Sequence, residues 1–348
     1  VVMREIEEEK IDFDIKKVKD IESRADIISI PEDIIKVIDW LVSYYISDYY
    51  NVIKTVFPGI LKLNYSKKAV FLKELEENAT YSNELTNEFN TYIKAKQVIT
   101  VDTIAKKFGK ELVEYARVKE AIKIEKQLIT KERKIKKLET EGIINETSFN
   151  LNGEQNNAVS TVENSDKNYF LIKGITGSGK TEVYIRLIKN ALIEGNGSIF
   201  LVPEISLTPQ MMSRLKKEFS NNVALLHSRL TNKERKEEWY SIKSGDKKVV
   251  IGARSAIFAP VQNLKYIILD EEHETTYKQE NNPRYHTKNV AIKRANLLGN
   301  VKVIFGSATP SFETYYQAKE GIIELIELNS RYNDAKKPTF GLVDLQKV

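Results

Sequence analysis

The chain has 348 residues, of which 41% are hydrophobic and 30% are charged, as in soluble globular proteins. No apolar run approaches the ~18 residues that a membrane-spanning helix needs. The acidic stretch at residues 5–9 stands where a signal peptide would be basic and then apolar, so a cytoplasmic location without a membrane partner is expected. With no Cys and only 3 His, disulfides and thiolate metal sites are excluded and a zinc centre has little room.

Residues 1–62 form the first of three blocks. Apolar and aromatic side chains recur at helical spacing from Ile34 to Tyr45, and two more Tyr follow at 49–50. An aromatic stripe of this kind is more often core than a surface that stacks on bases, and both readings stay open. Because the chain starts on Val1 and breaks off in the pattern at Val348, we expect a piece of a longer protein.

The second block, residues 66–138, has the pattern of a winged helix. Two helical runs flank Gly109, and the alternation at 123–129 is typical of a strand, so a helix pair followed by a β-hairpin is expected. Residues 94–138 contain 14 Lys and Arg against 6 Asp and Glu, a net charge of +8. This asymmetry favours a DNA partner, with a solvated charged face as the alternative. The candidate phosphate contacts are Lys106, Lys107 and Lys110.

The third block, residues 148–335, alternates short apolar strands with helical runs. Strands that are apolar throughout have both faces covered, which predicts an α/β fold with a parallel, doubly wound sheet. The expected strands are Tyr169–Ile172, Ile199–Pro203, Val223–Leu226, Val249–Gly252, Tyr266–Leu269 and Val301–Phe305.

The stretch that follows the first of these strands fits G-x-x-x-x-G-K-[ST]. Glycines let consecutive backbone N–H groups curl round a phosphate, Lys180 reaches the β and γ phosphates, and the Thr181 hydroxyl binds Mg²⁺. The sequence therefore predicts ATP and Mg²⁺ as ligands. The predicted ATP-binding residues are Gly174, Ile175, Thr176, Gly177, Ser178, Gly179, Lys180 and Thr181.

An acidic box, 270–273, comes directly after the strand at 266–269. The carboxyl ends of parallel strands share one crevice, so Asp270 is expected to hold Mg²⁺ and Glu271 to take a proton from the attacking water. Ser307 and Thr309, after another buried strand, are expected to sense the γ phosphate. Gln155 is expected to read the adenine edge. A lone Gln or a Ser/Thr loop is ordinarily turn chemistry, so these assignments depend on the other motifs.

Taken together, the motifs resemble the series found in superfamily 2 helicases of the DEAH-like kind. Two details are narrower and resemble the PriA family (primosomal protein N′): the wording of 252–260, and Tyr277-Lys278-Gln279 followed by Pro283-Arg284-Tyr285-His286. The motif segments are Gly174–Thr181, Leu201–Thr208, Gly252–Pro260, Asp270–His273 and Gly306–Ser311.

This resemblance implies an order of modules. Residues 1–62 would be the C-terminal part of a domain that binds the 3′ end of DNA, 66–138 a winged-helix domain, 148–335 the first RecA-like lobe, and 336–348 the start of a connection to a second lobe. A 3′→5′ helicase that recognises stalled forks and initiates primosome assembly is implied. Its partners would be DNA forks, single-stranded DNA, primosome proteins and single-strand-binding proteins.

The resemblance also assigns roles to residues. Lys180, Asp270 and Glu271 would be catalytic, Glu272 and His273 would complete the acidic box, and Arg254, Ser307 and Thr309 would couple the sites. Zinc is expected in a complete family member but has no ligands in this chain, and the chain by itself should hydrolyse ATP poorly without the second lobe. The DNA contacts in an aromatic-rich loop would be Tyr277, Arg284, Tyr285 and His286.

Two other functions remain open. One is a DNA-binding adaptor whose ATPase lobe is a nucleotide-gated switch without processive unwinding. The other is an unrelated P-loop enzyme such as a small-molecule kinase, against which the acidic box and Gly306–Thr309 together argue.

Overall fold

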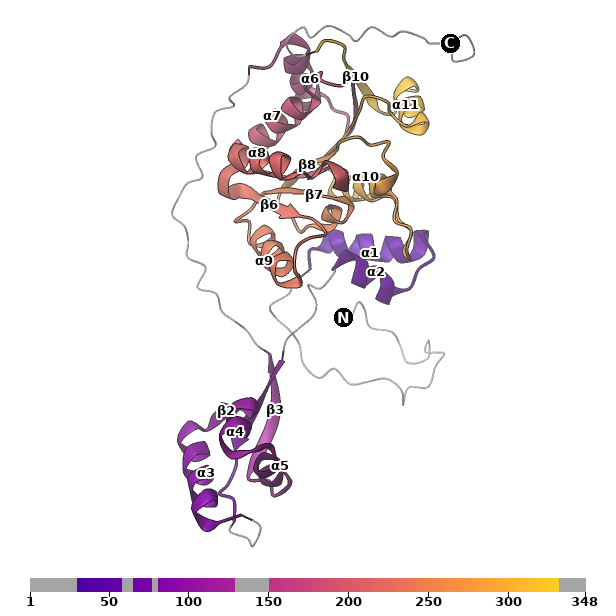
Figure 1. The fold of residues 1–348 in the computed structure, drawn as a ribbon. Coiled ribbons are helices and arrows are strands. Elements are labelled where there is room, and N and C mark those ends of the chain that lie inside the picture. The colour runs from indigo at the N-terminus through magenta and orange to yellow at the C-terminus, as the bar shows by residue number, and fades with distance from the viewer. Residues whose placement is uncertain (1–29, 58–64, 77–80, 129–149, 332–348) are drawn as a thin grey trace, which may run out of the picture. The chain divides into compact units, whose positions relative to one another are not determined.

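The computed structural model describes residues 30–57, 65–76, 81–128 and 150–331. The chain divides into two units, one made of residues 1–60 with 140–348 and one of residues 61–139. Figure 1 shows the elements of both. The expected segment at 336–348 lies outside the described residues, as do parts of the three expected blocks at 1–29, 58–62, 129–138 and 148–149.

A seven-stranded sheet of parallel strands is the centre of the first unit. The predicted α/β fold is confirmed, and all six expected strands are present within one or two residues of their predicted ends. In spatial order the strands are β10 (Glu324–Leu328), β4 (Tyr169–Gly174), β9 (Lys302–Ser307), β8 (Leu264–Leu269), β5 (Gly197–Leu201), β7 (Val249–Gly252) and β6 (Val223–Leu226).

Both faces of this sheet are covered by helices. Ile268 belongs to a core cluster with α7 and α8, and its neighbours Ile267 and Leu269, which point to the opposite face, are equally buried. On that side α10 packs against β9. The helices are α6 (Gly153–Asn164), α7 (Lys180–Ile193), α8 (Pro209–Phe219), α9 (Asn232–Lys243), α10 (Thr287–Leu298) and α11 (Phe312–Lys319), with short 3₁₀ turns η3 (Glu204–Ser206), η4 (Ser220–Asn222), η5 (Arg254–Phe258) and η6 (Thr275–Tyr277).

Two helices from the first expected block pack on this lobe. They are α1 (Glu32–Tyr44) and α2 (Tyr49–Val56), and Figure 1 shows them in indigo beside α10. Both nitrogens Nε and Nη2 of Arg294 donate to Asp33 Oδ2, at 3.0 and 2.7 Å, and Nη1 donates to the carbonyls of Ile257 and Ala259. Arg294 is 1% exposed. Ile34, Val37, Ile38 and Leu41 are fully buried, so the aliphatic part of the stripe is core and α1 belongs physically to the lobe, whereas Tyr44 and Tyr50 are 60% and 72% exposed.

The second unit has its own core and sheet. It contains β1 (Tyr65–Phe71), α3 (Asn83–Lys96), β2 (Val98–Thr100), α4 (Val101–Phe108), α5 (Lys110–Val118) and β3 (Ile122–Leu128). The helix pair around Gly109, whose φ is +84°, matches the prediction. The expected hairpin differs, because β3 pairs antiparallel with β1, which precedes the helices. Among the described residues β3 has no later partner.

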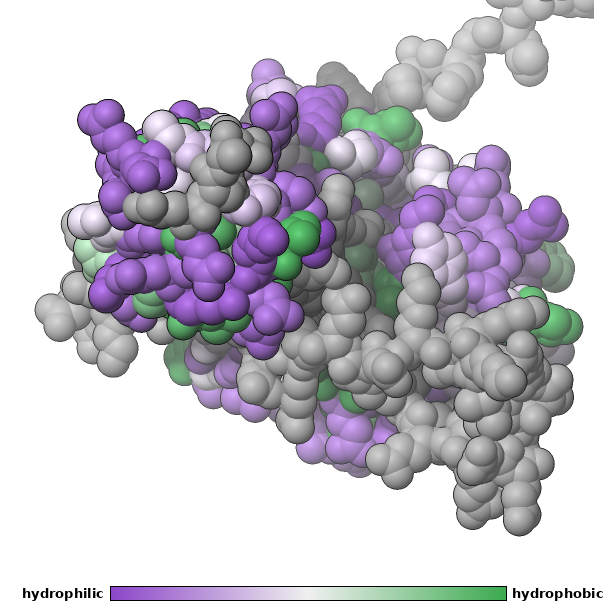
Figure 2. Space-filling model, turned by 90° about the horizontal axis from the view of Figure 1, so that it is seen from below, coloured by the Kyte–Doolittle hydropathy of each residue, from purple (hydrophilic) through white to green (hydrophobic). Residues whose placement is uncertain are grey.

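Polar surface dominates the face of the molecule seen in Figure 2, where apolar side chains form scattered spots. None of the described helices is long and apolar enough to cross a membrane. Within the described part of the chain, no group of three or more His, Asp or Glu side chains is arranged to hold a metal ion.

The buried ion pair gives a first prediction. Asp33→Ala should destabilise the lobe by about 2–4 kcal/mol, because it leaves the buried Arg294 guanidinium without its counter-charge. Glu32→Ala is the matched control: Glu32 pairs with Lys36 on the exposed side of the same helix, and its loss should leave the free energy of unfolding nearly unchanged. Urea unfolding measures both, and equal losses would contradict the prediction.

Candidate active site

Glycines shape the loop that joins β4 to α7. Gly177 and Gly179 have φ values of +82° and +80°, which favour residues without a Cβ. A Cβ at Gly174 would lie 2.5 Å from Ser178 Oγ, so the loop could not close over a larger residue. Thr176 and Gly177 are exposed at the top of the loop, and Lys180 and Thr181 begin α7. The backbone therefore has the open concave shape expected from the sequence motif.

Lys180 extends from the start of α7 back under this loop. Its side chain is buried, and Nζ donates to the Gly174 carbonyl at 2.9 Å. The same Nζ lies 3.9 Å from Glu271 Oε1 of the acidic box. Two motifs that are about 90 residues apart in sequence thus meet at one cation.

Strand order explains this meeting. β9 lies between β4 and β8, so the phosphate loop after β4 and the acidic box after β8 emerge at the same edge of the sheet, on either side of the segment after β9. Asp270 follows β8, and its N–H donates to the Leu201 carbonyl at the end of β5, at 2.9 Å. Glu271 has a φ of +45°, an unusual conformation for a residue with a side chain. This change of backbone direction comes immediately after Asp270, the carboxylate expected to hold Mg²⁺.

Burial raises the pKa of Asp270 to about 6, and the neighbouring Glu271 carboxylate adds to the increase, while Lys180 opposes it. Asp270 Oδ1 and Ser178 Oγ are buried and make no hydrogen bond of good geometry among the described residues, although the neighbouring Tyr184 hydroxyl interacts with the Asp270 carboxylate and lowers its pKa. A bound cation would stabilise the charged form of a carboxylate that is buried in this way. Together with the glycine cradle and Lys180, these buried oxygens fit a Mg²⁺-nucleotide.

The other two residues of the acidic box have structural partners. Glu272 is buried, forms an ion pair with Lys288, and accepts hydrogen bonds from Ser311 and Thr314. Burial opposes its ionisation, but Lys288 and these hydrogen bonds leave its pKa below the ordinary value. Glu272 therefore joins the acidic box to α10 and α11.

His273 makes the second connection. Its Nδ1 shares a hydrogen bond of 2.8 Å with Ser307 Oγ, which also accepts from the Thr309 N–H at 2.9 Å. His273 Nδ1 lies 3.6 Å from Glu271 Oε2. The structure thus brings Ser307 into contact with the acidic box, while the exposed Thr309 contributes its backbone to that group.

Tyr184 of α7 is a site residue that the sequence reasoning missed. Its ring is fully buried, and a Cβ at Gly306 would lie 1.6 Å from Tyr184 Oη and 3.5 Å from Asp270 Oδ1. Glycine is therefore required at 306 to admit the tyrosine hydroxyl beside Asp270. In sequence, Tyr184 reads as an ordinary core position of an amphipathic helix, and no local pattern distinguishes it.

Gln155 has another role in this structure than adenine recognition. Its Oε1 accepts from the Asn152 N–H at the start of α6, and its Nε2 donates to the Ser178 carbonyl, both at 2.9 Å. The side chain is 0% exposed. It braces the phosphate loop against α6 and keeps a second N–H and a second lone pair free. Adenine recognition stays a prediction, and it would require this buried side chain to become accessible.

Arg254 and the loop at 277–286 lie together, but the aromatic rings are placed differently from the expectation. Arg254 Nη1 donates to the carbonyls of Thr276 and Lys278, at 3.1 and 2.6 Å. Tyr277 and Tyr285 are 1% and 0% exposed, so neither ring is available to stack on bases in this structure. The Tyr285 ring packs against Phe258 of η5, with centroids 5.2 Å apart, and the Tyr277 hydroxyl reaches the carbonyls of Leu201 and Asp270.

The polar ends of that loop remain accessible. Arg284 is exposed, whereas His286 is half-buried as the N-cap of α10, where burial lowers its pKa. A groove of about 1190 Å³ runs along this edge of the lobe. Its polar lining includes Arg235, Arg254, Ser255, Lys278 and Lys288. Glu side chains at 204, 272, 274, 280 and 313 line it as well, so the groove is mixed in charge and only its Arg and Lys side chains suit a nucleic-acid backbone.

Lys106, Lys107 and Lys110 are all exposed in the second unit, on α4 and at the start of α5. Lys107 forms an ion pair with Glu88 at 2.9 Å, and its Nζ lies 4.3 Å from the centroid of the Tyr92 ring. Only Lys106 and Lys110 therefore extend into solvent without an ion pair described for them.

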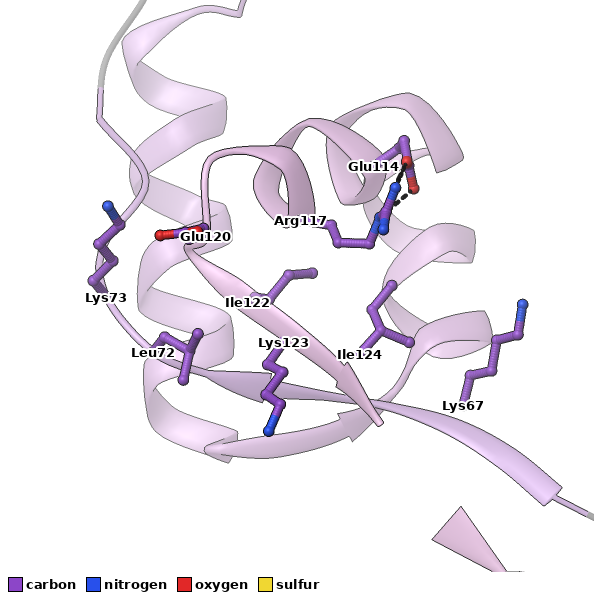
Figure 3. Close-up of a pocket in the computed structure, with 9 residues that line it drawn as sticks. All are labelled: Lys67, Leu72, Lys73, Glu114, Arg117, Glu120, Ile122, Lys123 and Ile124. Atoms are coloured by element: carbon purple, nitrogen blue, oxygen red, sulfur yellow. Dashed lines mark hydrogen bonds and ion pairs between the residues drawn. The ribbon is translucent and has the colours of Figure 1, made fainter. Parts of the chain in front are cut away.

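A separate basic depression lies between β1, β3 and α5, as Figure 3 shows. Ile122 and Ile124 point to the α5 side of their strand and Lys123 points to the other side. Arg117 is held by Glu114. Lys67, Lys73 and Lys123 are the further cations that line it.

The raised pKa of Asp270 predicts how stability depends on pH. The native carboxyl binds its proton more tightly than the unfolded one, so the nucleotide-free protein loses stability as the pH rises from about 4 to about 6 and bears the full cost above that. Asp270→Asn should therefore stabilise the nucleotide-free protein by about 1–3 kcal/mol at pH 8 and have little effect near pH 4. Urea unfolding without Mg²⁺ measures this. Glu280→Gln, at an exposed position, is the control, and a pH-independent effect of Asp270→Asn would refute the assignment.

Comparison with known proteins agrees with this geometry. A family model described as DEAD/DEAH box helicase matches residues 152–318. The replication restart protein PriA of Bacillus subtilis is 49% identical over 187 residues, which cover 54% of this chain and 23% of that protein. PriA of Chlamydia trachomatis is 34% identical over 334 residues, which cover 91% of this chain and 44% of that protein.

Among solved structures, RecG bound to a three-way DNA junction matches 54% of this chain and 25% of that chain, with a TM-score of 0.41 and 26% sequence identity. The chain spans less than half the length of the two PriA relatives described above. Residues 152–318 match a DEAD/DEAH box helicase domain, and the chain is similar to the PriA replication restart proteins over as much as 91% of its length.

Proposed function

We propose that this chain is the ATP-binding part of a 3′→5′ DNA helicase that restarts replication at stalled forks and initiates primosome assembly. The observation that supports the proposal most is the approach of Lys180 Nζ to within 3.9 Å of Glu271 Oε1, beside a buried Asp270 oxygen that makes no hydrogen bond of good geometry among the described residues. Similarity to PriA proteins supplies the biological context.

Each residue of the site has a distinct task in this proposal. Lys180 exchanges the Gly174 carbonyl for phosphate oxygens, and the backbone N–H groups of 175–180 bind the same phosphates. The N–H groups of Ile175 and Ser178 would first release the Leu328 and Ile175 carbonyls, to which they donate in the structure. Asp270 and Thr181 would hold Mg²⁺, which neutralises charge that develops on the phosphates. Glu271, which is partly exposed, accepts a proton from the attacking water. His273 and Ser307 transmit the state of the site to the segment after β9.

DNA would contact the groove that contains Arg254 and Lys278, with the exposed Arg284 at its rim. The winged-helix unit would add a second contact through Lys106 and Lys110. Forks, single-stranded DNA, primosome proteins and single-strand-binding proteins are the proposed partners, and zinc would be bound only by parts of the protein beyond this chain. A nucleotide-gated adaptor is the alternative, which DNA-stimulated ATP turnover by the complete helicase would exclude.

Two substitutions separate binding from chemistry. Lys180→Ala should weaken Mg²⁺-ATP binding and abolish DNA-stimulated ATPase activity in the complete helicase, because the phosphates lose their buried cation. Glu271→Gln keeps the shape of the site but removes the base, so it should bind ATP and hydrolyse it about 10²–10⁴-fold more slowly. Equilibrium binding of a fluorescent ATP analogue and steady-state ATPase assays measure the two effects.

The control for this pair is Lys216→Ala, on the exposed side of α8. It should change neither quantity. If Lys180→Ala keeps half of the wild-type turnover, or if Glu271→Gln hydrolyses ATP normally, the proposed roles are wrong.

Salt dependence tests the winged-helix unit. If Lys106 and Lys110 neutralise phosphates, replacing both with Ala should flatten the slope of log K against log salt for forked DNA by roughly one per lysine that touches a phosphate. Lys107→Ala should change the slope less, because its Nζ is paired with Glu88. Unchanged affinity and slope in the double variant would show that these charges are only a solvated face.

A further inference from the structure

The loop at 278–286 has a closed neck and an accessible tip. Lys278 and His286 form an antiparallel bridge, and the Gln279 N–H donates to the Tyr285 carbonyl at 2.9 Å. Between them Glu280 and Arg284 are exposed. The position of this neck, residues 278–279 and 285–286, therefore determines the position of the tip, residues 280–284, relative to a ligand in the groove.

The neck is connected to the nucleotide site through Tyr277. The Tyr277 hydroxyl lies 2.7 Å from the carbonyl oxygen of Asp270 and 3.0 Å from that of Leu201, within hydrogen-bond reach of both. Thr287 Oγ1 in turn donates to the Tyr277 carbonyl at 2.9 Å, from the first residue of α10. A displacement of the neck would therefore shift Tyr277 and, through its hydroxyl, the backbone of Asp270, the residue proposed to hold Mg²⁺.

Tyr45, the C-cap residue that follows α1, contacts both sides of this neck. Its hydroxyl oxygen accepts from the His286 N–H at 3.1 Å and from Asn289 Nδ2 at 3.2 Å. Lys278 Nζ lies 5.5 Å from the centroid of its ring, within cation–π range. Residues from the bridge and from the first turn of α10 therefore share one partner, which lies some 240 positions earlier in the chain.

The helix that carries Tyr45 is itself fixed to the lobe. The buried Asp33–Arg294 pair joins the start of α1 to α10, and Arg294 also binds the carbonyls of Ile257 and Ala259 at the end of η5. Arg254, at the start of η5, fixes the segment that leads into the loop, because it donates hydrogen bonds to the Thr276 and Lys278 carbonyls. Tyr45 thus has a rigid support against which to hold the neck.

We propose that Tyr45 is a positioning residue that couples nucleic-acid binding at the tip of the loop to nucleotide binding at Asp270. The coupling rests on the proposed function, because it presumes that the lobe binds both ATP and DNA. The coupling is the ratio of the nucleotide affinity with DNA to the nucleotide affinity without DNA, so it can be measured without hydrolysis.

The test measures the affinity of the chain for a non-hydrolysable fluorescent ATP analogue with Mg²⁺, with and without saturating oligodeoxythymidine. DNA should tighten nucleotide binding in the wild type. In Tyr45→Phe, which loses only the hydroxyl, that ratio should fall about three- to tenfold, the equivalent of one hydrogen bond. Nucleotide affinity without DNA and the melting temperature should stay at their wild-type values. If Tyr45 had a purely structural role, a decrease in the ratio of nucleotide affinities with and without DNA would be accompanied by a change in one of these two quantities.

Tyr44→Phe is the matched control, since Tyr44 is the neighbouring residue and is 60% exposed; it should keep the wild-type ratio. Asn289→Ala removes one donor to the same hydroxyl, and combined with Tyr45→Phe it should add nothing further. An unchanged ratio in Tyr45→Phe, or a wild type that binds both ligands without any coupling, would overturn this inference while leaving the proposed function intact. A wild type that binds no nucleotide would instead show that the proposed function has failed.

Discussion

The position of β9 between β4 and β8 is the constraint on which the site depends. Because the strands are parallel, the three segments that follow them emerge at one edge, about 10 Å apart at most from β4 to β8. This brings Lys180, Asp270 and Ser307 into one crevice and forces a carboxylate into a place where burial opposes its charge. The resulting imbalance is what a Mg²⁺-nucleotide would relieve, so the site is built to gain stability from its ligand.

The phosphate loop and acidic box could be predicted because each depends on neighbours in sequence. Glycine spacing at 174–179 determines the backbone, and a buried strand directly before Asp270 places its carboxylate. The strand β10, Glu324–Leu328 at the sheet edge, escaped prediction because two Glu interrupt the continuous apolar run that the interior strands have.

Tyrosines account for most of what sequence reasoning could not supply. Tyr184, Tyr277 and Tyr285 are all buried against the site or the loop beside it, and Tyr45 meets its partners across more than 240 residues. A phenol ring suits a core, a stacking platform or a hydrogen-bonding position equally well. Which of the three applies depends on contacts between distant segments, and no local pattern encodes these.

The Asp33–Arg294 pair also bears on how the chain reaches this fold. Its partners are 261 positions apart, and the second unit is inserted between them in sequence. During synthesis α1 emerges long before the surface that covers Ile34, Val37 and Ile38 exists, whereas residues 61–139 are complete early and contain their own core. Such non-local closure is slow, and it leaves an apolar helix face uncovered in the meantime. A ribosome-bound chain would thus finish its inserted unit first and seal the lobe last.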